Sequence, residues 1–431
     1  MKFFKKNNTQ AVDVSETRSG NAFQSSTGWQ RFHSNRAARW SLRILFVLIF
    51  VGVFADFLAN DKPIYCRIKG ETYFPILKEY GIKFGWSKGD QAYFLRKWQQ
   101  EDYEAVIFPL ITYNAQQTDT PNGYLGPFDK QNVSSWRFRH WLGADHIGRD
   151  IAAIMVHGTR TAMLVSVVSM GIATLIGLLL GSLAGFFGDD RLRVSKPRLL
   201  LNLAALALGL FYGFWVRSFA ISEGPVFLEL LKSLAILISA LLLANLISKA
   251  IEKRFLLSDN VPIPADMLVN RAIEVLHAIP ALLLLLSAAA LIKKPSIIYI
   301  MAIIGLLRWT GIARFIRAEL LRIRNLEYIE AARAMGLSEW RILFRHALPN
   351  GLAPVLVAIA FGMANTVLLE AFLSFLGIGL PPESASWGNA LQSARSYPQA
   401  WWITLFPGLG IFITITIFNL IGEGLSESGT T

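Results

Sequence analysis

The most distinctive spacing in this sequence belongs to six residues in a polar stretch, 316–350, between two long apolar runs. They are Glu330, Ala331, Ala332, Gly336, Leu348 and Pro349. Around them, Ile329, Ala332 and Met335 recur at helical spacing, which predicts a short amphipathic helix. Gly336 suits the left-handed residue that commonly ends such a helix. Glu330 then lies in the first turn, where the helix dipole favours a carboxylate.

A second short helix is predicted directly after this one. Ser338 can cap its first turn, and Trp340, Leu343 and Phe344 fall on one face. Pro349 fits a break before the next apolar run. The result is a helix-turn-helix elbow with an apolar ridge between arginines. Such a ridge can dock in a groove of another protein or lie on anionic lipid, and composition alone does not separate the two.

Motifs for nucleotide or metal chemistry are missing from the sequence. It has no G-x-x-x-x-G-K-[ST] phosphate loop and no H-E-x-x-H helix. The one cysteine, Cys66, can form neither a disulfide within the chain nor a cysteine-based metal site. We therefore expect any ATP to be bound elsewhere, and no catalytic, cofactor-binding or metal site on this chain.

The composition indicates a membrane protein. Of the 431 residues 53% are hydrophobic and only 17% are charged, whereas soluble domains carry about 25% charged residues. The net charge is +12, but the lysines and arginines lie in loops between apolar segments. A lipid bilayer is therefore the expected surroundings. Nucleic acid is not, because no basic-aromatic module of the kind that binds it is visible.

Eight apolar runs are long enough to cross a bilayer. They lie at about 42–58, 161–187, 198–220, 228–248, 268–292, 297–315, 351–376 and 402–422. Basic residues gather in the connections 191–198, 249–254 and 316–350, so the positive-inside rule places these loops and both termini in the cytoplasm. Lys293 and Lys294, in a loop expected outside, are the exceptions.

This pattern divides an all-α polytopic membrane protein into segments. They are a cytoplasmic arm (1–40), a first anchor (41–59), an extracytoplasmic segment (60–158), a transmembrane helix (159–190), an inserted transmembrane pair (191–260) and a core (261–425) that contains the loop 316–350. The extracytoplasmic segment is rich in Tyr, Trp, Phe and Pro and too polar to span. The inserted pair is expected to pack peripherally rather than to line a pathway.

Small residues mark one face of the second span. Ala173, Gly177, Gly181 and Gly185 recur every four residues. A stripe of this kind allows the backbone of a neighbouring helix to approach closely. We therefore expect a tight helix pair at this face.

Three ionisable residues near the spans deserve separate consideration. Glu274 and His277 are one turn apart near the predicted cytoplasmic end of their helix, and we expect them at the membrane interface. Glu370 lies closer to the outer end of its helix. It is the candidate to face a transport pathway.

The elbow carries a resemblance to a known family. Glu-Ala-Ala, three residues, Gly, and a later Leu-Pro resemble the coupling loop of ABC importer permeases. The resemblance implies a type I, MetI-like core of six transmembrane helices, here with an inserted pair to make about eight. It also implies a non-catalytic chain whose loop contacts a separate ATPase. The implied partners are two ATPase subunits that bind ATP and magnesium, a second homologous permease and an extracytoplasmic binding protein.

Further stretches narrow the resemblance. WLGADHIGRD at 141–150 is similar to the LGTDxxGRD stretch of C-type dipeptide and oligopeptide permeases, with Ala144 in place of Thr. FLGIGLPP at 375–382 and SWG at 386–388 are similar to a later region of that family. Short matches at 59–63 and 73–77 resemble its YejE-like branch, associated with larger peptides such as microcin C. Asp145, Arg149 and Asp150 are then expected to form an ion-paired amphipathic helix before the second span.

The expected function is therefore ATP-driven import of dipeptides or oligopeptides across the inner membrane. One alternative is an ion- or proton-coupled secondary transporter that uses Glu274, His277 or Glu370. Another is a membrane-embedded enzyme or scaffold with 60–158 as its working domain. The sequence does not name the peptide.

Overall fold

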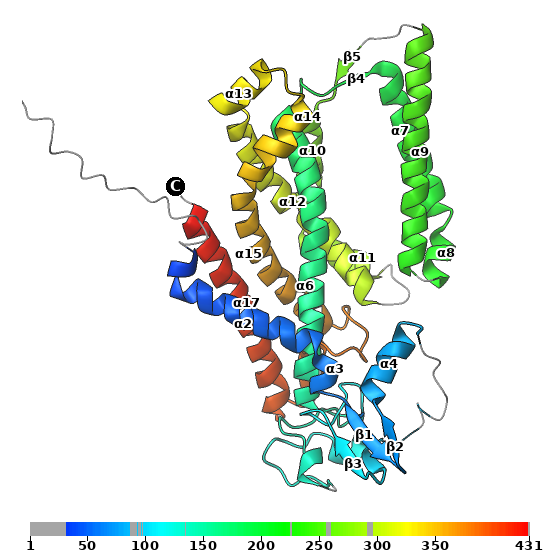
Figure 1. Cartoon of the computed structure of the whole chain (residues 1–431), viewed down its shortest axis with the longest axis vertical. Coiled ribbons are helices and arrows are strands. Elements are labelled where there is room, and N and C mark those ends of the chain that lie inside the picture. The colour runs from blue at the N-terminus through cyan, green and yellow to red at the C-terminus, as the bar shows by residue number, and fades with distance from the viewer. Residues whose placement is uncertain are drawn as a thin grey trace, which may run out of the picture.

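Residues 32–86, 93, 96, 98–133, 135–224, 226–255, 260–290 and 296–429 are described by a computed structural model of the chain. Long helices run between a small mixed segment at one end and a helical elbow at the other (Figure 1). Most of the expected arm 1–40, and both Lys293 and Lys294, lie outside the described residues.

The long helices follow one another in an order that matches the predicted apolar runs. The helices are α2 (Arg36–Val53), α3 (Ala55–Leu58), α4 (Pro75–Lys83), α6 (Ile151–Ser182), α7 (Lys196–Leu210), α8 (Ser218–Glu223), α9 (Val226–Phe255), α10 (Ala265–Ala278), α11 (Ala281–Ala290), α12 (Ile297–Ile323), α13 (Glu327–Ala334), α14 (Glu339–Ile342), α15 (Leu348–Phe375), α16 (Trp387–Ala394) and α17 (Trp401–Gly429). The strands are β1 (Tyr65–Ile68), β2 (Glu71–Tyr73), β3 (Ala105–Ile107), β4 (Arg193–Ser195) and β5 (Asn260–Pro262).

Six helices of the described part are long and apolar enough to cross a membrane, and a seventh span is possible. The seventh is the pair α10 and α11, which are bent by 81° at their junction. The predicted first anchor forms helix α2, but its 18 residues include Arg36, Arg39 and Arg43. In Figure 1 it crosses α6 at a steep angle. The eighth span therefore stays a prediction.

The long helix α6 and its partner α12 form the centre of the bundle. A Cβ built on Gly177 would lie 2.6 Å from the side chain of Ile312, and one on Gly181 would lie 2.5 Å from the carbonyl oxygen of Ala313. A Cβ on Gly185 would lie 2.6 Å from the carbonyl oxygen of Arg317. The predicted close packing at this stripe is confirmed.

The segment 60–158 contains a small sheet that the hydrophobic pattern did not predict. Strand β1 is central, with β2 and β3 antiparallel on either side, and Cys66 pairs with Tyr73 and Val106. Cys66 and Trp98 are buried in the small core beneath it. Three- and four-residue strands among turns carry too few alternations for their period to be recognised.

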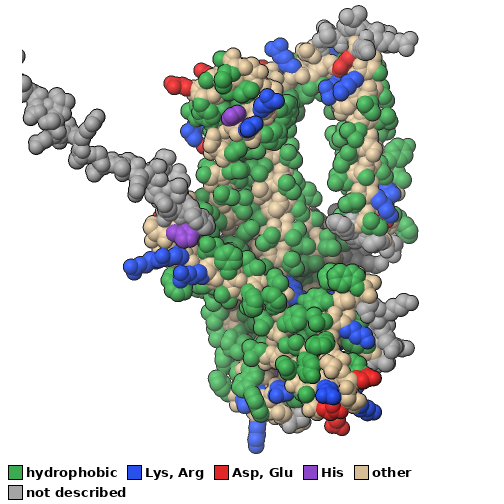
Figure 2. Space-filling view, in the orientation of Figure 1, with side chains coloured by type: hydrophobic (Ala, Val, Ile, Leu, Met, Phe, Trp, Pro, Cys, Tyr) green, Lys and Arg blue, Asp and Glu red, His purple; other side chains and the backbone are tan. Residues whose placement is uncertain are grey.

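The inserted pair forms a hairpin of its own, in which α7 packs on α9. The side-chain amides of Asn202 and Asn245 bond to each other at 3.1 Å, and Arg198 donates to Asn245 at 2.7 Å. Strands β4 and β5 join its base to the rest (Figure 1). Apolar side chains cover its long sides (Figure 2). In the apolar membrane-spanning part of each helix, only 17% of the residues are buried in the span Lys196–Trp215 and 11% in the span Leu228–Glu252. The corresponding share is 28–39% for the other four spans.

The two ends of the described chain lie together. Asn35 donates to the carboxylate of Glu427 at 2.8 Å. A Cβ on Gly424 would lie 2.4 Å from that of Ala38. The start of α2 and the end of α17 therefore share one side of the bundle.

Candidate functional site

The predicted elbow is present as two short helices between α12 and α15 (Figure 1). Its first helix, α13, ends at a turn in which Gly336 has a φ of +77°. The N–H of Leu337 donates to the carbonyl of Ala332 at 3.3 Å, and that of Gly336 to the carbonyl of Arg333 at 2.9 Å. This is the Schellman pattern of helix termination. The prediction for Gly336 is confirmed.

The first elbow helix has an inner and an outer face. Ile329 and Ala332 are buried in the bundle, whereas Met335 is 73% exposed. Glu330 and Ala331 are also exposed. The predicted short amphipathic helix is present, but Met335 does not belong to its buried face, because α13 ends at Ala334 and Met335 already lies in the turn. Ala332 therefore helps to anchor the elbow.

The second elbow helix shows the same division. Leu343 is buried, whereas the rings of Trp340 and Phe344 are exposed and stacked 6.0 Å apart. A π-turn begins at Leu343 and changes the angular spacing of the side chains, so the predicted shared face of these three residues is wrong. Trp340 also contacts Phe187 at the end of α6, at 4.8 Å between ring centroids.

The helix does not break before the next span. Residues 339–375 form one continuous candidate span in which the π-turn precedes Pro349. The π-turn shifts the hydrogen-bond register and so accommodates a residue without an N–H. The predicted break at Pro349 is therefore wrong. Ser338 occupies the cap position, but its hydroxyl makes no capping bond.

The six predicted residues thus fall into three groups by exposure. Glu330, Ala331, Gly336 and Pro349 are exposed, Leu348 is half-buried and Ala332 is buried. With Met335, Trp340 and Phe344, the exposed residues form a surface that we call the elbow surface. It combines a carboxylate with aromatic and thioether side chains, a composition suited to docking in a protein groove.

An ion pair that was not predicted braces the elbow. The guanidinium of Arg333 donates to the carboxylate of Glu339 at 2.9 Å and to the carbonyl of Arg324 at 3.2 Å. It also lies 5.7 Å from the ring centroid of Phe186. The sequence does not predict this pairing, since the contact of Arg333 with Glu339 depends on the fold of the intervening turn.

The ionisable residues near the spans have different surroundings. Glu274 pairs with Arg271 at 2.7 Å on the surface of α10, as an interfacial residue would. His277 contacts the carbonyl of Ile273 at 2.9 Å. Glu370 is buried inside the chain. Its carboxylate accepts hydrogen bonds from Ser374 at 2.9 Å and Ser386 at 2.7 Å.

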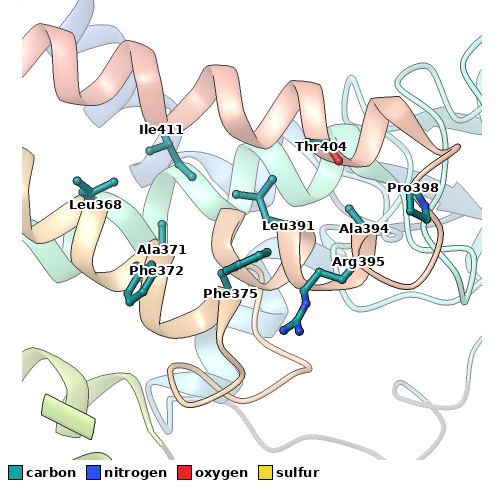
Figure 3. A pocket seen from close by; sticks show the side chains of 10 residues that line it. All are labelled: Leu368, Ala371, Phe372, Phe375, Leu391, Ala394, Arg395, Pro398, Thr404 and Ile411. Carbon is teal, nitrogen blue, oxygen red and sulfur yellow. The ribbon is translucent and has the colours of Figure 1, made fainter. Parts of the chain in front are cut away.

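In this geometry the carboxylate of Glu370 is enclosed rather than facing an open surface. Its suggested place in a pathway therefore stays a prediction without support from these contacts. The nearby cavity of about 480 Å³ between α15, α16 and α17 is mostly apolar (Figure 3). Arg395, at its edge, lies 5.4 Å from the ring centroid of Phe375.

The stretch 141–150 is a loop rather than the predicted amphipathic helix. Gly143 and Gly148 both have positive φ, +84° and +83°, and two such residues break a helix. The predicted ion pair is present, with Arg149 donating to Asp145 at 2.7 Å. Arg149 also donates to the carbonyl of Pro382 at 3.0 Å, which joins this loop to the region after α15.

Asp150 begins the central helix and takes part in a buried charge cluster. Its carboxylate accepts from the N–H of Ala153 at 2.7 Å and so caps α6. His140 contacts Asp150 at 2.8 Å and Asp119 at 3.3 Å, and stacks on Tyr113. Burial alone would lower the pKa of His140, but the two carboxylates outweigh it and raise that pKa above its ordinary value.

Comparison with known proteins identifies the chain. Residues 260–427 match the family described as the inner membrane component of binding-protein-dependent transport systems. Residues 24–71 match the N-terminal transmembrane domain of oligopeptide transport permease C. A peptide permease protein of Brucella ovis is 30% identical over 75% of this chain and 82% of its own length. This chain is an ABC-transporter permease.

Two further relatives match almost the whole permease. The peptidoglycan transport system permease protein YejE of Agrobacterium fabrum is 27% identical over 93% of this chain and 91% of its own. The inner membrane ABC transporter permease protein YejE of Escherichia coli is 27% identical over 93% and 95%. These relatives confirm the predicted resemblance and the MetI-like fold class. The ion- or proton-coupled alternative is wrong.

Family membership has consequences for the site. A permease of this kind is a membrane subunit that associates with ATPase subunits and a binding protein. Within the part that the structure describes, no cluster of His, Cys, Asp or Glu could hold a metal ion.

Proposed function

We propose that this permease carries peptides inward across the inner membrane. The support comes from the relatives, whose names assign the Brucella ovis protein to peptide permeases and the Agrobacterium fabrum protein to peptidoglycan transport. Peptides and peptide-bearing cell-wall fragments share amide backbones and carboxylates. Oligopeptides are therefore the substrate class that both names have in common.

The proposal includes the assembly. Two ATPase subunits bind ATP and magnesium, a second homologous permease completes the pathway, and an extracytoplasmic binding protein delivers the peptide. The chain itself is non-catalytic. Its elbow and both termini are cytoplasmic, which fits the shared location of the two ends of the described chain and the basic residues near the elbow (Figure 2).

The observation that carries the mechanism is the two-faced elbow. Its inner residues, Ile329 and Leu343, are fully buried against the bundle. Its outer residues, Glu330 and Trp340, are free to contact a partner. An ATPase that closes on ATP would move the outer face, and the buried inner face would carry that movement to α6 and α12.

The test reverses the charge of Glu330 in the complete transporter in proteoliposomes. Glu330→Arg should lower ATP-driven uptake of tritiated peptides by about tenfold or more, as expected when a charge-assisted contact of about 1.5–3 kcal/mol is lost. Glu274→Arg is the matched control, since Glu274 is an exposed carboxylate outside the elbow. Equal uptake by the two variants would contradict the coupling role of the elbow.

A further inference from the structure

A charged side chain lies partway along a membrane helix without a partner. Arg308 is the twelfth residue of the 27-residue helix α12, so it lies about 17 Å along a helix about 39 Å long. Among the described residues, none donates to, accepts from or pairs with its guanidinium. Two other arginines of the spans are paired, Arg160 with Asp56 and Arg317 with Asp266.

Arg308 borders a cavity of about 280 Å³. One wall belongs to α12 and includes Arg308, Thr310 and Gly311. A Cβ on Gly311 would meet nothing within 4 Å, so the space beside α12 is open at this point. The opposite wall is the junction of α10 and α11, with Ile279 and Pro280.

The wall opposite Arg308 is a break in a membrane helix. The chain bends by 81° there, and Ile279 has extended backbone angles. Non-helical backbone at membrane depth is tolerated only inside protein or beside a water-filled cavity. The first turn of α11 also begins at this break, and its N–H groups have no partner within the helix. Like Arg308, these groups favour negative charge.

We propose that Arg308 binds the carboxylate of a peptide as the peptide crosses the membrane through this cavity. This inference rests on the proposed function and deepens it. An unpaired guanidinium at this depth is costly, and a two-pronged, charge-assisted bond to a carboxylate offsets that cost. A lipid phosphate fits less well, because headgroups lie about 15 Å from the centre of the bilayer.

The experiment uses the complete transporter in proteoliposomes, with a library of tritiated peptides that have free C-terminal carboxylates. Arg308→Gln should lower uptake per ATP hydrolysed by about tenfold or more, and Arg308→Glu by still more. Arg308→Lys should recover only part of the uptake lost in Arg308→Gln, since lysine retains the charge but cannot form the two-pronged bond. The matched control is Arg314→Gln, which changes an exposed arginine of the same helix outside the cavity.

Each other outcome overturns the inference in its own way. Unchanged uptake by Arg308→Gln would leave peptide transport intact and remove Arg308 from the pathway. If the second permease no longer co-purified with the Arg308→Gln variant, Arg308 would instead pair with a carboxylate of that subunit. A defect seen only in vesicles with phosphatidylglycerol, and not in pure phosphatidylcholine, would assign Arg308 to lipid. Absence of ATP-driven uptake by the wild type would instead contradict the proposed function itself.

Discussion

The guanidinium of Arg333 donates to the carboxylate of Glu339 at 2.9 Å, across the turn that Gly336 forms. This contact closes the elbow, because it joins the helix before the turn to the helix after it. The same guanidinium bonds to the carbonyl of Arg324 and lies beside the ring of Phe186. One side chain thus connects both elbow helices to the ends of α12 and α6.

Removing the charge of Glu339 should weaken coupling more than stability. Both partners are partly exposed, so Glu339→Gln should cost less than about 1 kcal/mol of unfolding free energy. Peptide uptake per ATP hydrolysed should nevertheless fall severalfold, because the two elbow helices would no longer be joined by the Arg333–Glu339 ion pair and could move separately. Glu319→Gln is the control, since Glu319 pairs with Arg322 on α12, outside the elbow. A ratio of uptake to hydrolysis that is the same in both variants would exclude this role.

The turn of the elbow should be sensitive to a single methyl group. Gly336 has a positive φ but open space around its Cβ position. Gly336→Ala should therefore cost about 1–2 kcal/mol through backbone strain alone. Gly171→Ala, at an open position within α6 without positive φ, should be neutral or slightly stabilising. Thermal unfolding of the two purified variants measures the difference, and equal melting temperatures would count against strain at Gly336.

The pair α6 and α12 should not tolerate a side chain at its closest approach. A Cβ on Gly181 would lie 2.5 Å from the backbone oxygen of Ala313, which cannot move without the helix. Gly181→Ala should destabilise the permease by about 1–3 kcal/mol. The same Gly171→Ala variant serves as the control. A Gly181→Ala variant as stable as the wild type would mean that the two helices are further apart than described.

The charge cluster at the start of α6 predicts a pH dependence. Because Asp150 and Asp119 raise the pKa of His140 above 6.5 in the folded state, the folded protein binds this proton more tightly than the unfolded chain. The resulting stability is complete below about pH 6.5 and is lost as the pH rises through the raised pKa. The melting temperature should therefore fall with rising pH in the wild type. His140→Gln should flatten this part of the profile, and an unchanged slope would contradict the assignment.

Local rules predicted the features that depend on neighbouring residues. The four-residue spacing of Gly177 and Gly181 is sufficient to place them on one face, because an α-helix fixes that geometry. Gly336 was predictable for the same reason, since a glycine after an amphipathic stretch matches a common helix end. Both features depend on a few residues of sequence.

Features that depend on distant contacts were not predictable in this way. The charged residues at 145–150 predict a helix, but the stretch 141–150 is a loop in which Gly143 and Gly148 adopt positive φ. The loop is held from outside by the carbonyl of Pro382, which bonds Arg149 across 233 positions of sequence. The buried carboxylate of Glu370 likewise depends on Ser386 from the next loop. No spacing rule relates such residues.

The most direct test of the account is a cross-link from the elbow surface to an ATPase. The native Cys66 is buried, so it should not react with a thiol label. A second cysteine can therefore be introduced at Met335, which is 73% exposed, and labelled with a benzophenone maleimide. Phe128→Cys, at an exposed position of the segment 60–158, is the matched control. In the assembled transporter, illumination should join the label at 335, and not that at 128, to an ATPase subunit. A cross-link from 128 alone, or from neither position, would contradict the central claim.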